Sequence, residues 1–127
     1  MSEIFVSTGD LADFTKKVLL KSGVQDDVAG YVTAGLVQTS LRGVDSHGIR
    51  LLPHYVASVK AGRINPKPEY KFKKTSASTG KLDADHTFGH AAGMEAVKKA
   101  VELAREAGSG HIAVYNSSHF GAAAYYT

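Results

Sequence analysis

The amino-acid sequence predicts an α/β fold in which helices come first and the strands of a mixed sheet follow. Three segments in the first half of the chain repeat apolar residues at helical spacing. An alternating apolar and charged segment follows at 70–73, and a helical pattern over 88–107 leads into the apolar run 111–115. We therefore expect a helical part over residues 1–65 and a sheet-forming α/β part over residues 66–127.

Length and composition exclude several classes of protein. The chain has 127 residues, 43% of them hydrophobic and 21% charged, and no Cys. This is the composition of a globular domain, and it excludes disorder, thiolate catalysis, Cys-ligated zinc and iron–sulfur clusters. No apolar run approaches the ~18 residues that span a bilayer. Because Met1-Ser2-Glu3-Ile4 does not resemble a secretory signal, we expect a cytoplasmic protein without a membrane partner.

The first predicted helix begins at Ser7, a capping residue, and ends at Gly23. Its predicted apolar face consists of Leu11, Phe14, Val18 and Leu19. The apolar run Ile4-Phe5-Val6, just before the helix, is compatible with a short strand. These signals predict an N-terminal helix that packs one face on a core.

Two further helices follow. One opens at Asp26-Asp27 and runs to about Leu41, with apolar residues on more than one face, so we expect it to be buried on most sides. The next ends at Gly62 and presents Leu52, Tyr55, Val56 and Val59 on one face. Because proline fits only a first helical turn, this helix is predicted to start near Pro53, with residues 46–51 forming a separate turn.

The second half of the chain carries strand patterns. The alternation at 70–73 predicts a strand, and residues 81–83 are expected to pair with it across the turn 76–80. The helix over 88–107 has its predicted apolar face at Met94, Val97, Val101 and Ala104. The run 111–115 is expected to be a buried strand.

The last residues, 121–127, have the composition of a helix that has only begun. They carry no polar stop signal, and one apolar face is not completed. We therefore expect the chain to be the first part of a longer polypeptide and the sheet to be incomplete without the remainder.

Two short stretches combine a hydroxyl, an imidazole and a glycine: residues 45–50 (Asp-Ser-His-Gly-Ile-Arg) and 116–121 (Asn-Ser-Ser-His-Phe-Gly). Histidine titrates near neutrality and can exchange protons at working pH. The second stretch follows a predicted strand, at the carboxyl end where open α/β sheets hold their sites. Both stretches are candidate sites, although a loop histidine beside a serine is more often structural.

Other kinds of site are disfavoured. A serine hydrolase is a poor fit because the adjacent side chains of Ser46 and His47 are expected to point apart and no G-x-S-x-G is present. Zinc binding by His86 and His90 is disfavoured since His86 precedes the helix, so we expect no metal. Gly108-Ser109-Gly110 precedes a strand rather than a helix, so the sequence has no Rossmann fingerprint.

The basic residues of the chain are concentrated between residues 60 and 81, with seven Lys or Arg against the single acid Glu69. Tyr70 and Phe72 alternate with lysines there, as in a platform for stacking bases. Such lysines more often occupy the solvent face of an edge strand. We therefore expect no nucleic-acid partner, and a non-catalytic module that binds RNA or an acidic protein through 60–81 is the alternative function.

The two candidate stretches together resemble a known family. The run 41–56, which contains Arg42-Gly43-Val44-Asp45-Ser46-His47-Gly48 and Pro53-His54-Tyr55, resembles the RG-x-DSHG … P-x-Y signature of the malate/L-lactate dehydrogenase family. This family differs from the Rossmann-type enzymes and includes sulfolactate dehydrogenase, ureidoglycolate dehydrogenase and diketogulonate reductase. Further matches, in the family's order, are 61–65, 82–85, 88–90, 116–121 and Tyr125-Tyr126. The resemblance covers nearly the whole chain and about the first third of a typical member.

The resemblance implies reversible reduction of a 2-oxo acid, such as oxaloacetate or pyruvate, or of a related imino acid, with NAD or NADP as cofactor. His47 matches the proton donor of some members, with Ser46 orienting it or relaying a proton. His119 matches the acid–base histidine of others, and the sequence leaves the choice between the two open. A donor is needed because hydride arrival builds negative charge on the carbonyl oxygen.

Substrate binding is also implied. Several relatives have an arginine four residues after the first histidine; Leu51 stands there in this chain, and Arg50 is the candidate for the substrate carboxylate. Tyr55 matches a position that hydrogen-bonds substrate in relatives, and it equally fits the apolar face of its helix. The resemblance assigns no cofactor-binding residue in this chain. It implies a homodimer, and we expect the isolated chain to be inactive.

Overall fold

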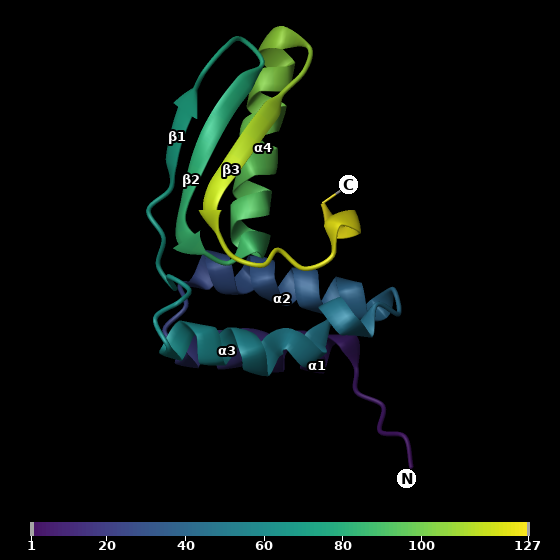
Figure 1. Ribbon diagram of the computed structural model, residues 1–127. Coiled ribbons are helices and arrows are strands. Elements are labelled where there is room, and N and C mark those ends of the chain that lie inside the picture. The colour runs from purple at the N-terminus through teal and green to yellow at the C-terminus, as the bar shows by residue number, and fades with distance from the viewer. Residues whose placement is uncertain (1, 127) are drawn as a thin grey trace.

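The computed structural model describes residues 2–126 and shows three helices followed by a small sheet with one long helix on it (Figure 1). The helices are α1 (Thr8–Lys21), α2 (Asp26–Leu41), α3 (Leu52–Lys60) and α4 (Gly89–Ala107). The strands are β1 (Lys71–Lys74), β2 (Thr79–Thr87) and β3 (His111–Ser117), and the 3-10 turns are η1 (Asp45–His47), η2 (Ile49–Leu51) and η3 (Ala123–Tyr125). The α/β class is confirmed.

The sheet is mixed, as predicted. In the order β1-β2-β3, the first pair is antiparallel and the second is parallel. Because β2 and β3 are parallel, their carboxyl ends lie at the same edge of the sheet, where α4 also begins. Figure 1 shows the helices α1, α2 and α3 gathered at this edge, while α4 runs along one face of the sheet.

Among the described residues, no helix combines the length and apolar character needed to cross a bilayer.

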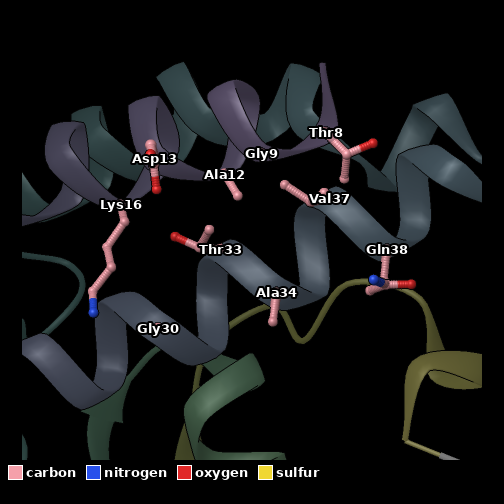
Figure 2. Close-up of a pocket in the computed structure, with 10 residues that line it drawn as sticks. All are labelled: Thr8, Gly9, Ala12, Asp13, Lys16, Gly30, Thr33, Ala34, Val37 and Gln38. Atoms are coloured by element: carbon pink, nitrogen blue, oxygen red, sulfur yellow. The ribbon is translucent and has the colours of Figure 1, made fainter. Parts of the chain in front are cut away.

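α1 and α2 pack against each other through small side chains and leave a hollow between them (Figure 2). Its lining residues are Thr8, Gly9, Ala12, Asp13, Lys16, Gly30, Thr33, Ala34, Val37 and Gln38. The Thr33 hydroxyl is buried there without a hydrogen-bond partner among the described residues. No candidate site residue lines this hollow.

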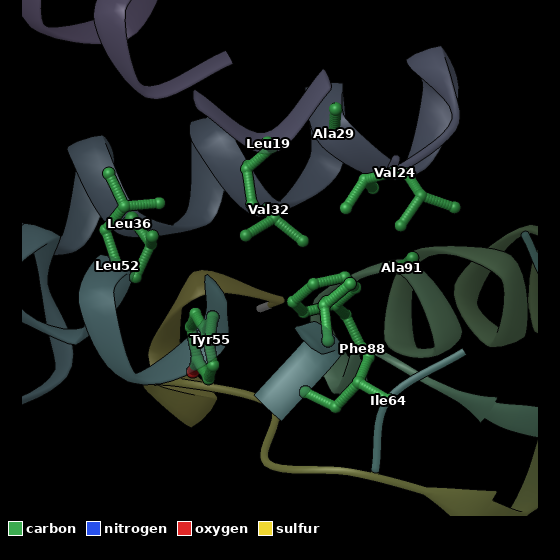
Figure 3. Packing of buried hydrophobic residues seen from close by; sticks show 12 residues of the cluster. Leu19, Val24, Ala29, Val32, Leu36, Leu52, Tyr55, Ile64, Phe88 and Ala91 are labelled. Atoms are coloured by element: carbon green, nitrogen blue, oxygen red, sulfur yellow. The ribbon is translucent and has the colours of Figure 1, made fainter. Parts of the chain in front are cut away.

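The apolar core joins the helical layer to the start of α4 (Figure 3). Its buried members are Leu19, Val24, Val28, Ala29, Val32, Leu36, Leu52, Tyr55, Val59, Ile64, Phe88 and Ala91. α2 contributes on several sides, as its sequence predicts, and is the central helix of the layer. The core therefore fixes α3 and the first turn of α4 relative to each other.

The predicted helix boundaries are confirmed. The Ser7 side chain accepts a hydrogen bond from the Asp10 amide at 3.1 Å and caps α1. Gly23 and Gly108 follow the ends of α1 and α4 with φ angles of 91° and 81°, a region that favours glycine. Pro53 lies in the first turn of α3, and the residues before it form the two separate turns η1 and η2.

Three predictions about the N-terminal and C-terminal segments need correction. Ile4-Phe5-Val6 is not a strand: it is extended and exposed, with Phe5 88% accessible. Phe14 is 60% exposed, and the neighbouring Thr15 is buried instead, together with the predicted Leu19. The helix expected over 121–127 is a single 3-10 turn at Ala123–Tyr125, and Thr127 lies outside the described residues.

The apolar face predicted for α4 is wrong as well. Val97 and Val101 are exposed, and the buried residues along the helix include Ala92, Ala96 and Leu103. The helix carries two apolar stripes, and the one with small side chains allows the closer approach to the sheet. The run 111–115 forms β3 but is largely exposed, because β3 pairs with β2 alone and α4 covers only one face.

Close packing of α4 on the start of β3 requires glycine at position 110. A Cβ there would lie 2.0 Å from the Ala100 carbonyl oxygen, whereas a Cβ on Gly30 in α2 would meet nothing within 4 Å. Gly110→Ala is expected to lower the free energy of unfolding by about 1–3 kcal/mol through overpacking. Gly30→Ala is expected to raise it by about 0.5–1 kcal/mol, because Ala favours a helix. Urea unfolding of both variants tests the pair; equal effects would contradict the packing.

Candidate active site

The two candidate stretches meet at the carboxyl edge of the sheet. The rings of His47 in η1 and His119, just beyond β3, stack with centroids 5.6 Å apart and planes inclined by 29°. His47 is half-buried and His119 is exposed to solvent on its free side. The structure therefore brings together two histidines separated by 72 positions in the chain, each carried by a different layer.

Each histidine is held by backbone contacts of its own segment. The η1–η2 segment is attached to the end of α2 because the Ser40 hydroxyl accepts from the Ile49 amide at 2.9 Å. The His119 segment is attached to the start of α4, where the Gly89 amide donates to the His119 carbonyl at 3.2 Å. Both imidazoles are thus placed by helix ends that the apolar core already fixes.

Tyr55 links the two layers. Its hydroxyl lies 2.7 Å from His119 Nδ1, while its ring is 1% exposed and packs edge-on against Phe88 and His90. Burial raises the pKa of Tyr55 to about 12, so the hydroxyl keeps its proton at working pH. The Gly121 amide, which can only donate, also points at His119 Nδ1, at 3.4 Å. The neutral His119 ring therefore carries its proton on Nε2.

The electrostatic environment favours a neutral His119. Partial burial, followed by the charges that His47 and His54 can carry, lowers the pKa of the His119 ring. Two stacked imidazoles disfavour a second positive charge because like charges repel at this distance. A charge on His47 therefore opposes protonation of His119.

Ser46 contacts His47, and the expectation that their side chains point apart is wrong. The Ser46 hydroxyl lies 2.8 Å from His47 Nδ1, because the tight 3-10 turn η1 lets the short serine side chain reach the neighbouring ring. The bond engages Nδ1 of His47 and leaves Nε2 for another partner. The serine is exposed.

Position 51, where several relatives have an arginine, and the candidate Arg50 differ in their exposure to solvent. Leu51 is half-buried and packs against the apolar core. Arg50 is exposed on η2, three residues after His47. A different arginine, Arg42, donates from Nη1 to the Ala124 carbonyl at 2.7 Å and ties the end of α2 to η3.

Comparison with known proteins decides the family. The family model described as malate/L-lactate dehydrogenase matches residues 6–127. The chain belongs to the malate/L-lactate dehydrogenase family. It is 40% identical to a malate dehydrogenase of Pyrococcus abyssi over 92% of this chain and 32% of that protein. It is 39% identical to an L-sulfolactate dehydrogenase of Methanocaldococcus jannaschii over 87% of this chain and 32% of that protein.

Solved structures agree with this assignment. Malate dehydrogenase from Pyrococcus horikoshii OT3 superposes with a TM-score of 0.93 and 35% identity, over 97% of this chain and 35% of that one. Sulfolactate dehydrogenase from Methanocaldococcus jannaschii gives a TM-score of 0.92 and 35% identity, over 97% of this chain and 36% of that one. The chain thus spans about a third of the length of these family members.

Two of the segments that match the family, 61–65 and 82–85, contact each other and have a structural role. Asn65 donates to the Asp85 carboxylate at 2.8 Å, and the same oxygen accepts from the Glu69 amide at 3.0 Å. Asp85 and His86 have positive φ angles of 49° and 60° and form an irregularity where β2 loses register with β3. These contacts fix the end of β2 just before Phe88.

Within residues 2–126, no group of three or more His, Asp or Glu could hold a metal ion.

His90 has a place in the site that its sequence pattern did not predict: it was a disfavoured zinc ligand and part of a family-like segment, without a role. His90 lies in the first turn of α4 and is 1% exposed. Burial, and the charge that His119 can carry, lowers its pKa to about 4, so His90 is neutral at working pH. The available sequence signal was its place in Phe88-Gly89-His90, one of the segments that match the family.

The basic stretch does not form an open stacking surface at Phe72. This ring is half-buried, and Lys99 of α4 lies over it with Nζ 5.6 Å from the centroid. Lys74 pairs with Glu106 at 2.9 Å. The face of Phe72 that a base would need is therefore occupied by the chain's own lysine, which disfavours the alternative of an RNA-binding module.

Removing the Tyr55 hydroxyl tests its bond to His119. In Tyr55→Phe, His119 Nδ1 loses the hydroxyl that can accept its proton in the charged ring, while the donor-only Gly121 amide remains, so the pKa of His119 is expected to fall further. The free energy of unfolding should fall by about 0.5–1.5 kcal/mol. NMR titration of the histidine ring protons measures the first effect. Tyr115→Phe, at an exposed position on β3, is the control; an unchanged His119 titration in Tyr55→Phe would contradict the bond.

The buried His90 predicts a pH dependence of stability. Its pKa of about 4 lies below the ordinary value of 6.5, so the unfolded chain binds more protons between these values. Stability is therefore fully present above pH 6.5 and is lost as the pH falls towards 4, by up to about 3 kcal/mol. Urea unfolding across this range should show a shallower slope in His90→Gln than in wild type. Identical slopes would contradict the prediction.

Proposed function

We propose that this chain provides the proton-transfer and substrate-binding part of an enzyme that reduces a small 2-oxo acid, such as oxaloacetate or pyruvate, with NADH or NADPH. The observation that carries the proposal is the stacked His47–His119 pair with Tyr55 bonded to one ring. The relatives named malate dehydrogenase and L-sulfolactate dehydrogenase support a hydroxy acid as product.

His119 is proposed as the proton donor. In reduction a hydride is added to the carbonyl carbon, the C=O π bond breaks, and the oxygen takes up a proton to become a hydroxyl. A reduced nicotinamide, when bound, supplies that hydride. Protonated His119 releases its Nε2 proton to the oxygen, and the ring is left neutral with its proton on Nδ1, where the Tyr55 hydroxyl can accept it. Exchange with solvent returns the ring to the Nε2–H form. The lowered pKa of His119 makes the imidazolium a stronger acid.

Tyr55 supports both protonation states of His119. A hydroxyl can donate to Nδ1 of the neutral ring and, after rotation about its C–O bond, accept from Nδ1–H of the protonated ring. Because the Tyr55 pKa is near 12, the hydroxyl does not give up its own proton in the cycle. Its role in this proposal is to orient the imidazole, and the buried ring makes that orientation rigid.

His47 and Ser46 are proposed to orient the substrate. The Ser46 hydroxyl engages His47 Nδ1, so Nε2 can contact the substrate carbonyl or carboxylate. Arg50, one residue before the core residue Leu51, is proposed as the cation for the carboxylate, since a guanidinium matches a carboxylate in a bidentate geometry.

Cofactor binding is not assigned to residues of this chain. Gly108-Ser109-Gly110 connects α4 to β3, the reverse of the strand-to-helix order that places a pyrophosphate on a helix N-terminus. The described residues therefore do not fit a dinucleotide site of that type. A homodimer, a cytoplasmic location and inactivity of the 127-residue chain alone remain predictions.

Turnover in a protein that contains this chain at the length of its relatives tests the assignment. His119→Gln is expected to lower kcat by about 10²–10⁴-fold, the usual contribution of a general acid, with little change in KM. His47→Gln should raise KM more than it lowers kcat. Oxidation of NADH and NADPH is followed with oxaloacetate, pyruvate and sulfopyruvate. His111→Gln, an exposed histidine at the opposite end of β3, is the control. Full activity of His119→Gln would overturn the proposed role.

A further inference from the structure

His90 is enclosed next to the candidate site, yet neither of its ring nitrogens has a hydrogen-bond partner among residues 2–126. Burying a polar group without a partner costs about 1–3 kcal/mol. An apolar side chain of similar size at this position would avoid that cost. The imidazole therefore stabilises the fold less than a leucine would.

Three segments of the chain meet at the His90 ring. A Cβ on Gly35 of α2 would lie 2.4 Å from His90 Cδ2, and a Cβ on Gly121 would lie 2.4 Å from His90 Nε2. The backbones of both glycines therefore lie directly against the ring. The third contact is Tyr55 of α3, whose ring is edge-on to His90 with centroids 5.6 Å apart.

Two of these three neighbours hold His119 Nδ1. Tyr55 contributes its hydroxyl at 2.7 Å and Gly121 its amide at 3.4 Å. His90 contacts the Tyr55 ring and the Gly121 backbone at the same time, and Gly35 of α2 lies against Cδ2 of the same ring. A shift of the His90 ring would therefore move both donors relative to the imidazole that they orient.

We propose that His90 is a positioning residue for the proposed acid–base histidine: its enclosed ring sets the distance and direction from the Tyr55 hydroxyl and the Gly121 amide to His119 Nδ1. The inference rests on the proposed function of His119 for its consequence in turnover. The titratable groups around His90 are Tyr55 and His119, with His47 and His54 beyond them. His90 does not contact substrate in this proposal and exchanges no proton with it.

The test changes the packing of His90 from two directions. His90→Leu removes the ring, and Gly35→Ala pushes it from α2 with a residue that favours a helix. NMR titration of His119 in the 127-residue chain is the first readout. Both variants are expected to shift the pKa of His119, because the Tyr55 hydroxyl and the Gly121 amide move relative to Nδ1. Gly30→Ala, in the same helix with open space around it, is the matched control.

The second readout is turnover in a protein that contains this chain and has the full length of its relatives. His90→Leu and Gly35→Ala should lower kcat by about tenfold or more at constant KM, because small displacements of a catalytic group reduce rates steeply. His90→Gln, which keeps a neutral polar side chain, should recover part of the loss. If His90→Leu does not fold, Gly35→Ala alone decides. An unchanged His119 titration in a folded variant overturns the positioning role, whereas a shifted titration without loss of turnover overturns the proposed function of His119.

Discussion

The hydrogen bond between Tyr55 and His119 is the contact on which the candidate site depends. It joins a residue of α3 to a residue beyond β3, 64 positions apart in the chain. The Tyr55 ring is fixed by the apolar core, and the His119 backbone is fixed by the first turn of α4. The 2.7 Å distance is therefore set by the packing of the helical layer on the sheet, and not by either segment alone.

Features that cost stability are gathered at the same edge of the sheet. Asp85, His86 and Asn116 have positive φ angles, which non-glycine residues adopt at a cost, and all three lie near the ends of β2 and β3. His90 is buried nearby, and its ring nitrogens have no hydrogen-bond partner in the part of the chain that the structure describes. The apolar core below the site offsets these costs, which is the usual arrangement where a protein holds reactive side chains in a fixed geometry.

The sequence was sufficient for the features that depend on local chemistry. Capping at Ser7, the first-turn position of Pro53 and the glycine after α4 each follow from one or two residues, and the structure confirms them. The sequence was insufficient for features that depend on contacts between segments far apart in the chain. α4 has two apolar stripes and only its contact with the sheet selects one, so Val97 was predicted to be buried. The role of His90 depends on glycines 55 and 31 positions away, which no local pattern connects.

In the proposed function, the chemistry of carbonyl reduction is divided between different parts of a family member. The groups proposed to transfer and position the proton lie within this chain, because both imidazoles and the tyrosine that contacts one of them come from residues 47–119. The groups around His119 Nδ1 are a hydroxyl and an amide, so the site stabilises a neutral imidazole without placing a carboxylate beside it. In the proposed function, a site of this kind suits a substrate that is itself an anion, because a fixed carboxylate would repel it. The substrate would then approach from the solvent-exposed side of His119.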